Sequence, residues 1–517
     1  MTLTPLGPDA WLFRFAGSAD EAAFGMARRL AAGLGRTPLP GLVEGVPAFT
    51  TLLLRFEAGR APTSAALWPV LEGWLEGEVS AGTARHVELP VHYAGADLSR
   101  VAEHARLPVA EVIARHTAAN YRVHCLGFAP GFPYLGGLDP RLHTPRLASP
   151  RPRVPAGSVA IGGEHTGVYS LASPGGWNLL GRTSETLFEP RADSLETMFR
   201  LRTGDTVRFC SESELPPAGA SETAFTAPAT TPRLGLRILS AGVGLGLQDL
   251  GRPGFARFGV PPGGAMDPTA AAWANRLLDN PVDAALLELC LQGQRLEVLD
   301  DAWLAVTGSA APRGRDRNSA FRGRTGDILE FGPGPAGVWT YLAIPGGWDG
   351  PALLGSRSAN PRAGIGLTAS PGDVLAARGA ARFQPPSAVA ARCVPWNEAV
   401  DFGNPAPLRV WPGPQWDSFP VSDREHFFAS NWAVSGQCDR VGYRLLGSPL
   451  RPEPAQIISE PVLPGSIQVP ANGQPIVTMP DGPTIGGYPK LGLVDPADLA
   501  RLAQCRPGQS VRFRPVG

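Results

Sequence analysis

Glycine and proline set the main limit on what this chain can fold into. The sequence has 63 glycines and 55 prolines among 517 residues, spread over its whole length. Glycine adds backbone freedom and proline lacks an amide hydrogen, so both interrupt helices and long strands. The apolar runs between them are short, which is typical of many short strands joined by tight turns. The sequence therefore predicts a globular, mostly β protein.

Charge and cysteine content bear on the surroundings of the chain. The formal net charge is zero, which disfavours nucleic acid or an anionic membrane surface as the main partner. The N-terminus lacks the pattern of a signal peptide, and no run approaches the roughly 18 apolar residues of a membrane span. The six cysteines are scattered singly without a C-x-x-C pair, which disfavours a zinc site. We expect a cytoplasmic protein without a metal site.

Composition divides the chain into two halves. Residues 213–232 are mainly small, polar and proline residues without periodicity, which predicts an extended linker. Before the linker we expect a small α+β domain at 1–85 and a mostly β domain at 86–212. After it, from residue 233, most segments again have the pattern of strands. The expected fold class is α+β, mostly β.

A few segments have helical periodicity. Apolar residues recur with a helical period in 18–35 and 64–79, which predicts two amphipathic helices. A third helix is expected from Asp267, a typical N-cap residue, to the Asn280-Pro281 stop.

Two segments also resemble each other. Residues 154–177 and 462–489 share a start of the type Gly-Ser-β-branched, a second strand after a polar turn, and a Gly-Gly-aromatic end. Similar β-barrels in both halves would explain this similarity, and chance likeness between two glycine-rich β segments is the alternative.

The first half resembles a known family. The stretch "GFAPGFPYLGGLDPRLHTPRLASPRPRVPAGSVAIGG", followed by "SPGGWNLLGRT", is similar to the B subunit of the bacterial ATP-dependent 5-oxoprolinase. Kinase-inhibitor proteins of sporulating bacteria and the first allophanate-hydrolase-type region of urea amidolyase belong to the same family. The resemblance covers most of residues 1–215.

The second half resembles the partner family, over about residues 233–517. "GLQDLGRPGFARFGVPPGGAMD" and "SEPVLPGSIQVPANGQPIVTMPDGPTIGGYPKLG" are similar to the C subunit, the biotin-dependent carboxyltransferase-like partner. The two resemblances imply a cyclophilin-like β-barrel in each half, each with an accessory α/β domain. In the second half they imply an N-terminal domain at 233–340 and the barrel at 341–517. They also imply that two usually separate subunits are fused, which keeps both partners together and suggests a site at their interface.

Lys490 is the only lysine in the chain. An ammonium group can lose its proton when desolvated and can act as a nucleophile or a general acid/base, which a guanidinium cannot do near neutral pH. In a chain that otherwise uses arginine, this exception predicts a catalytic role for Lys490. The alternative is a surface lysine retained by chance.

Gly486, Gly487 and Tyr488 precede this lysine and are candidate substrate-binding residues. The glycines would let the backbone approach a ligand and adopt positive φ, and Tyr488 would supply an aromatic wall with a hydroxyl. Ordinary turn chemistry uses the same residue types, so that alternative stays open.

Four polar residues of the second half are further candidates. Asp439 is a candidate catalytic group, and Arg440 or Arg444 could clamp a substrate carboxylate through two parallel hydrogen bonds. Gln468 would suit an amide or lactam, because its side chain can both donate and accept a hydrogen bond. For Asp439, Arg440 and Arg444 a structural salt bridge is the alternative.

The first half supplies His124 as a candidate catalytic residue and Tyr134 and Trp177 as candidate substrate-binding residues. A histidine or tryptophan beside apolar strands more often packs in a core, which is the alternative for both types.

Arginines of the first half are candidate phosphate ligands. The charge and planar geometry of guanidinium groups suit phosphate oxygens, and the alternative is a solvated face. The candidates are Arg146, Arg151, Arg153 and Arg182.

Several common motifs are absent from the sequence. It contains no P-loop, no G-x-S-x-G elbow and no dinucleotide fingerprint with its acidic partner. The single lysine lies in Tyr-Pro-Lys-Leu rather than in an A-M-K-M-type biotin site. Covalently bound biotin and an allophanate hydrolase site are therefore not expected.

Three functional hypotheses follow. The first is a component of an ATP-dependent 5-oxoprolinase, which uses ATP, with Mg²⁺, and a separate A subunit to convert 5-oxoproline to L-glutamate. The second is the carboxyltransferase unit of a urea carboxylase, because "DGPTIGGYP" begins with Asp-Gly-Pro where the C subunit commonly has Asp-Arg-Gln. The retained Tyr-Pro-Lys favours the first. The third is a regulator that binds a sensor histidine kinase, although a fused inhibitor and antagonist would be permanently silenced.

Overall fold

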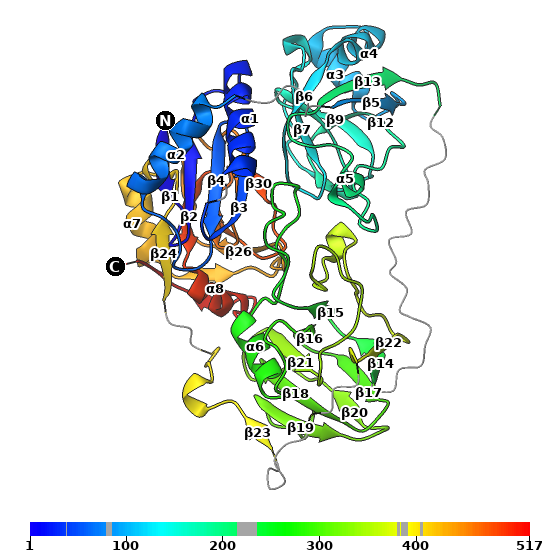
Figure 1. The fold of residues 1–517 in the computed structure, drawn as a ribbon, viewed down its shortest axis with the longest axis vertical. Coiled ribbons are helices and arrows are strands. Elements are labelled where there is room, and N and C mark those ends of the chain that lie inside the picture. The colour runs from blue at the N-terminus through cyan, green and yellow to red at the C-terminus, as the bar shows by residue number, and fades with distance from the viewer. Residues whose placement is uncertain are drawn as a thin grey trace.

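The computed structural model describes residues 1–37, 39–78, 85–214, 235–379, 383, 391–403 and 407–516 (Figure 1). Strands form 33% of the structure and helices 19%, which confirms the expected α+β, mostly β class. Most of the predicted linker lies outside the described residues. None of the helices in the described part of the chain has the length and hydropathy needed to span a membrane.

The N-terminal unit is a four-stranded antiparallel sheet, ordered β1-β2-β4-β3, with two helices packed on it. Both predicted helices are present. Asp20 and Thr63 accept backbone amides at their N-termini, as N-cap residues do. The elements are β1 (Thr2–Pro5), β2 (Ala10–Arg14), α1 (Glu21–Arg36), β3 (Leu42–Pro47), β4 (Thr51–Phe56) and α2 (Ser64–Glu76).

The second unit is a nearly closed barrel of seven strands, ordered β12-β9-β10-β7-β6-β13-β5. A two-stranded ribbon, β8 with β11, and helices α3 to α5 accompany it. The elements are β5 (His86–Val91), α3 (Leu98–Ala105), α4 (Val109–Ala118), β6 (Tyr121–Leu126), β7 (Pro133–Gly136), β8 (Arg151–Val154), β9 (Ser158–Gly162), β10 (His165–Val168), β11 (Ser173–Gly175), β12 (Asn178–Arg182), α5 (Leu195–Met198) and β13 (Thr206–Ser211).

The third unit contains the second nearly closed barrel, in the sheet β20-β17-β14-β22, and a six-stranded sheet, β15-β16-β21-β18-β19-β23. Asp267 caps helix α6, as predicted. The elements are β14 (Gly235–Ala241), β15 (Gly244–Gln248), α6 (Pro268–Arg276), β16 (Leu286–Cys290), β17 (Gln294–Val298), β18 (Ala302–Gly308), β19 (Ser319–Gly323), β20 (Ile328–Glu330), β21 (Trp339–Ala343), β22 (Val374–Ala376) and β23 (Arg392–Cys393).

The C-terminal unit is an eight-stranded sheet, β32-β25-β26-β29-β28-β31-β24-β33, with helices α7 and α8. A short ribbon, β27 with β30, lies beside it. The elements are β24 (Leu408–Pro412), α7 (Val421–Ala429), β25 (Trp432–Val434), β26 (Gly442–Leu446), β27 (Glu460–Pro461), β28 (Ser466–Gln468), β29 (Ile476–Thr478), β30 (Ile485–Gly486), β31 (Lys490–Val494), α8 (Pro496–Ala503), β32 (Ser510–Val511) and β33 (Phe513–Pro515).

The seven-stranded and eight-stranded sheets share part of their connectivity. In each, the first strand pairs in parallel with the last, β5 with β13 and β24 with β33. The two similar sequence segments form the antiparallel hairpins β9–β10 and β28–β29. Each hairpin is entered through a glycine with positive φ, Gly157 or Gly465, a conformation that glycine adopts at little cost. The sequence similarity therefore reflects a similar local structure.

The predicted boundary at residue 340 is wrong. It falls inside β21, and both β22 and β23 pair with strands that precede it. The strand pairing changes from one unit to the next between Cys393 and Leu408. Residues 341–517 also contain the eight-stranded sheet, which starts only at Leu408. Its two end strands, β32 and β33, are separated by Arg512 alone, so this sheet closes on itself as well. Strand-like segments on both sides of residue 340 look alike in the sequence, which hid the true boundary.

The two halves are joined by a common core. The N-terminal unit lies beside the C-terminal sheet (Figure 1). One apolar cluster contains Leu12 of the N-terminal unit, Tyr134 of the seven-stranded barrel and Ile485 of the C-terminal unit. Arg14 of β2 also pairs with Glu460 of β27, with 2.8 Å between nitrogen and oxygen. Residues from the two ends of the chain therefore meet at this interface.

Candidate functional site

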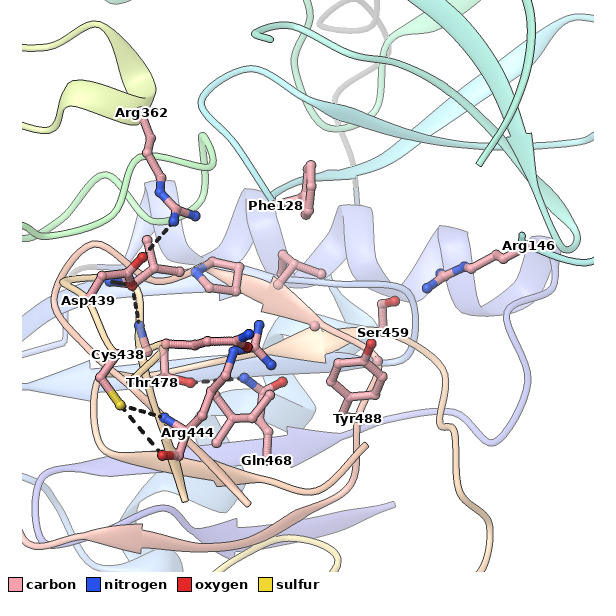
Figure 2. A pocket seen from close by; sticks show the side chains of 18 of the residues that line it. Phe128, Arg146, Arg362, Cys438, Asp439, Arg444, Ser459, Gln468, Thr478 and Tyr488 are labelled. Atoms are coloured by element: carbon pink, nitrogen blue, oxygen red, sulfur yellow. Dashed lines mark hydrogen bonds and ion pairs between the residues drawn. The ribbon is translucent and has the colours of Figure 1, made fainter. Parts of the chain in front are cut away.

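A cavity of about 550 Å³ lies between the two halves, where the sequence placed the site (Figure 2). We call it the first cavity. The first half contributes Phe128, Tyr134 and Arg146 to its wall. The second half contributes, among others, Arg362, Asp439, Arg444, Ser459, Gln468, Thr478, Gly486, Gly487 and Tyr488.

Two arginines of the first cavity have free guanidinium groups. Arg444 lies on β26, where strand alternation buries Tyr443 and Leu445 in the core and leaves Arg444 on the opposite, exposed face. Arg146 lies over the ring of Trp177, with its guanidinium carbon 5.7 Å from the ring centroid. Within the described residues, neither guanidinium has a hydrogen-bond or ion-pair partner. Both cations are therefore available to an anionic ligand.

Gln468 presents a hydrogen-bond acceptor to the first cavity. Its side-chain amide donates to the hydroxyl of Thr478 at 2.9 Å, and both residues are buried. The carbonyl oxygen Oε1 points toward Gly486, and a β-carbon built on Gly486 would lie 2.8 Å from it. The missing side chain of Gly486 thus leaves room for this oxygen.

Gly486 and Gly487 differ from the sequence expectation in one respect. Neither has positive φ, so the left-handed backbone predicted for them is wrong. Instead they provide space, because a β-carbon on Gly487 would lie 3.2 Å from the hydroxyl of Ser459. Tyr488 follows them at the cavity wall with 38% of its surface exposed.

Asp439 lies at the edge of the first cavity in an ion pair with Arg362. The two side chains are 2.6 Å apart, and Figure 2 shows this contact. The other carboxylate oxygen of Asp439 accepts the backbone amides of Val441 and Gly442 at 2.8 and 3.2 Å. These bonds fix the position of the Asp439 side chain.

Lys490 does not line the cavity. Its side chain is fully buried, and its ammonium nitrogen lies 2.5 Å from Oε1 of Glu460 and 3.1 Å from the carbonyl oxygen of Pro461. Glu460 also accepts bonds from Arg14 and Gln415. Lys490 is therefore part of a buried ion-pair network, shielded from solvent and outside the lining of the first cavity.

The network accounts for the pKa values of this pair. Burial lowers the pKa of Lys490, and the neighbouring Glu460 opposes part of that effect. Burial alone would raise the pKa of Glu460, but Lys490, Arg14 and Gln415 together hold it below its ordinary value. Glu460 is thus a carboxylate at neutral pH.

Arg440 is also separated from the first cavity. It donates to Asp481 at 2.7 Å and to Glu288 at 2.5 Å, which joins the C-terminal unit to the barrel unit before it. Burial alone would lower the pKa of Arg440, but Asp481 and Glu288 raise it overall. The structural salt bridge, which was the alternative at the sequence level, is what the structure shows for Arg440.

His124 lies in an aromatic cluster of the first half. Its ring stacks on Phe49 and meets Phe24 edge-on, and a β-carbon on Gly136 would clash with it. Burial, with smaller contributions from His165 and Arg122, lowers the pKa of His124 to about 4. The ring is neutral near pH 7 and lies outside the first cavity, so the catalytic role predicted for it plays no part in our proposal.

The candidate phosphate-binding arginines do not gather at one point. Arg146 lines the first cavity, whereas Arg151 pairs with Asp97 at 2.7 Å. Arg153 is exposed on β8, and Arg182 donates to the carbonyl oxygen of Ala156. A phosphate group in the first cavity could therefore reach only Arg146 of this set.

Sequence reasoning missed several residues of the first cavity. Phe128 has positive φ, which is unusual for a phenylalanine, and it lies inside a quoted motif that gave no hint of its role. Ser459 and Thr478 lie inside the motif quoted for the second half, which gave no hint of their roles, and Arg362 comes from a segment with no distinguishing pattern. Their contribution depends on contacts between units, which a local pattern does not record.

Comparison with known proteins identifies related domains. Residues 1–198 match the family model "Carboxyltransferase domain, subdomain C and D", and residues 258–515 match "Carboxyltransferase domain, subdomain A and B". The chain is 35% identical over 288 residues to the 5-oxoprolinase C subunit of Escherichia coli K12, which is 54% of this chain and 90% of that protein. It is 44% identical over 179 residues to the 5-oxoprolinase B subunit of Escherichia coli O157:H7, 34% of this chain and 81% of that protein.

A solved structure has the same overall arrangement. The crystal structure of TTHA0988 superposes with a TM-score of 0.85 and 36% identity, covering 98% of this chain and 99% of that one. Urea amidolyase of Lachancea kluyveri is 29% identical over 315 residues, 54% of this chain and 17% of that protein.

Proposed function

Since the chain belongs to the families of the B and C subunits of 5-oxoprolinase, joined in one polypeptide, we propose that it is a component of an ATP-dependent 5-oxoprolinase. With a separate A subunit, it would open the lactam ring of 5-oxoproline to L-glutamate and hydrolyse ATP, bound with Mg²⁺. The observation that carries this proposal is the first cavity, where both halves place free cations beside a buried hydrogen-bond acceptor.

The lining of the first cavity suits the two ends of 5-oxoproline. Its carboxylate needs a cation, and the free guanidinium of Arg444 can bind both oxygens through parallel hydrogen bonds. The lactam N–H needs an acceptor, and Oε1 of Gln468 points into the cavity with its own amide nitrogen fixed by Thr478. Tyr488 and Phe128 flank this space and would cover the apolar ring carbons.

The chemistry requires more than binding, because an unstrained lactam resists water. Transfer of the γ-phosphoryl group of ATP to the lactam carbonyl oxygen releases ADP and activates the ring carbon. Water then adds to that carbon and the C–N bond breaks, leaving an acyl phosphate that a second water hydrolyses to glutamate and phosphate. Arg146 and Arg362, on opposite sides of the cavity, could stabilise the charge on the phosphoryl group.

The test measures glutamate and phosphate released from 5-oxoproline and ATP by the purified chain mixed with a homologue of the A subunit. We expect turnover that requires both proteins. Arg444→Gln should lower kcat/KM roughly 10- to 100-fold, since a hydrogen bond to a charged group contributes about 1.5–3 kcal/mol. Arg451→Gln, an exposed arginine outside the cavity, is the matched control and should leave the rate unchanged. Wild-type turnover by Arg444→Gln would show that Arg444 does not bind the substrate carboxylate.

A second candidate function is carboxyl transfer from a carboxybiotin carried by another protein to an amide substrate. The description of both matching family models favours it, as does the Asp-Gly-Pro start at Asp481. A carboxylated product formed from carboxybiotin and urea-like amides, without any release of glutamate, would establish this alternative in place of the first.

A further inference from the structure

A second cavity of about 650 Å³ adjoins the first. It lies between the edge of the six-stranded sheet at β15 and the segment from Gly436 to Val441 of the C-terminal unit. Arg362, Cys438, Asp439 and Val441 line both cavities. The ion pair between Arg362 and Asp439 therefore stands at the boundary between two neighbouring spaces, and both of its side chains are about half exposed.

The two cavities differ in charge. Among the described residues that line the first cavity, Arg146, Arg362 and Arg444 face a single carboxylate, Asp439. An anionic ligand is favoured there.

The charged residues around the second cavity have the opposite balance. Three carboxylates, Asp439, Glu288 and Asp481, line it together with two arginines, Arg362 and Arg440. Glu288, Asp481 and Arg440 already bond to one another. A polyanion is disfavoured in this space, whereas a neutral group meets no charge penalty.

The rest of the second cavity suits a flat, neutral heterocycle. Leu245, Leu291, Val338 and Trp339 provide apolar surface. Asn360 lines it with only 3% of its surface exposed. Its carbonyl oxygen accepts the amide of Ala363, but within the described residues its amino group has no hydrogen-bond partner.

The free amino group of Asn360 favours a ligand that carries a hydrogen-bond acceptor. A ligand that covered the cavity wall without supplying an acceptor would leave this donor unsatisfied, at a cost of roughly 1–3 kcal/mol, whereas an acceptor nitrogen of a bound base would satisfy it.

We propose that the second cavity binds the nucleoside part of ATP, with the triphosphate running past the Arg362–Asp439 pair so that its γ-phosphate enters the first cavity. This inference rests on the proposed function for the identity of the nucleotide. The heterocycle occupies the second cavity beside its apolar residues and accepts a hydrogen bond from Asn360. The phosphates lie on the cationic side, where the lactam is held by Arg444 and Gln468.

The test uses Thr368→Trp, because Thr368 is exposed and lines the second cavity but not the first. Binding of a non-hydrolysable ATP analogue and of inorganic tripolyphosphate to the full chain is measured by calorimetry, with the homologue of the A subunit present. We expect the variant to bind the analogue at least tenfold more weakly and tripolyphosphate as the wild type does. Ser370→Trp, exposed two residues further on and outside both cavities, is the matched control and should bind both probes normally.

A second variant, Asn360→Asp, keeps the acceptor for Ala363 and removes the free donor. It should weaken binding of the ATP analogue more than binding of tripolyphosphate. The change in tripolyphosphate binding measures the effect of the carboxylate charge that the variant adds. Wild-type affinity for the analogue in Thr368→Trp, or equal weakening of both probes in both variants, would overturn the inference. A lack of 5-oxoproline turnover with analogue binding that depends on Thr368 and Asn360 would instead refute the proposed substrate and leave the nucleotide site in place.

Discussion

The loop from Ile485 to Lys490 serves two regions that differ in almost every physical respect. Toward the first cavity it presents Gly486, Gly487 and Tyr488 beside free arginines. Two residues after Tyr488, Lys490 is fully buried and held by Glu460. Within the described residues the guanidinium groups of Arg146 and Arg444 lack partners, whereas the ammonium group of the lysine has two. Only the first arrangement leaves charge available to a substrate.

This difference answers why the single lysine is not an arginine. The buried space offers one carboxylate oxygen of Glu460 and the carbonyl oxygen of Pro461 as acceptors. A compact ammonium fits them, while a guanidinium would bring five N–H donors and more volume into the same space. The single lysine is thus explained by the small space and the two acceptors around its side chain. The arginines that remain available for a ligand lie in the first cavity.

The largest effect is expected from Lys490→Met. Removal of the ammonium leaves Glu460 as a buried carboxylate with less compensation, which should lower the free energy of unfolding by about 3–5 kcal/mol. Denaturant unfolding followed by tryptophan fluorescence measures it. The double variant Lys490→Met, Glu460→Gln removes both charges of the buried pair and leaves only Arg14, whose side chain is 37% exposed, so it should regain most of the loss. Equal stability of the wild type and Lys490→Met would contradict the structural role of the pair.

A smaller effect is expected at Gly486. In Gly486→Ala the new methyl group would lie 2.8 Å from Oε1 of Gln468, so the amide has to move. Overpacking of this kind costs about 1–3 kcal/mol, and the displaced acceptor should raise the KM for 5-oxoproline. Gly332→Ala is the control, because nothing lies within 4 Å of a β-carbon placed on Gly332. An unchanged KM in Gly486→Ala would show that Gln468 does not bind the substrate.

The smallest expected effect is a loss of folding stability at acidic pH. The pKa of Glu460 in the folded chain lies below its ordinary value of 4.5, so below that pH the unfolded chain binds more protons than the folded one. The contribution of the pair is complete above about pH 4.5 and declines as the pH falls further. As the pH is lowered from about 6 to 3, the denaturant concentration at the unfolding midpoint should therefore fall more steeply for the wild type than for the double variant. Parallel profiles would show that Glu460 keeps an ordinary pKa.

The sequence predicted local structure well where the cause is local. Asp267 precedes a helix because its carboxylate accepts the amide of Ala270, and this relation is visible in the residue order. Gly157 and Gly465, each with positive φ, likewise precede the two similar hairpins, and both glycines are visible in the sequence. Such features depend on a few neighbouring residues, so pattern reasoning finds them.

Roles that depend on distant partners could not be read in the same way. Asp439, Arg440 and Arg444 look like one charged cluster in the sequence. In the structure Arg440 bonds to Glu288 and Asp439 pairs with Arg362, while the guanidinium of Arg444 has no partner within the described residues. The partners of the first two lie about 150 and 80 residues away in the sequence, and no local spacing encodes them. The same holds for Glu460, which determines the role of Lys490.

The most direct test compares turnover of 5-oxoproline and ATP, with a homologue of the A subunit, between Arg444→Gln and the double variant Lys490→Met, Glu460→Gln. Both proteins are first shown to be folded by their unfolding midpoints. The account predicts near wild-type turnover for the double variant and a roughly 10- to 100-fold loss for Arg444→Gln. A folded but inactive double variant beside an active Arg444→Gln would show that the chemistry depends on the lysine and not on the cavity arginine.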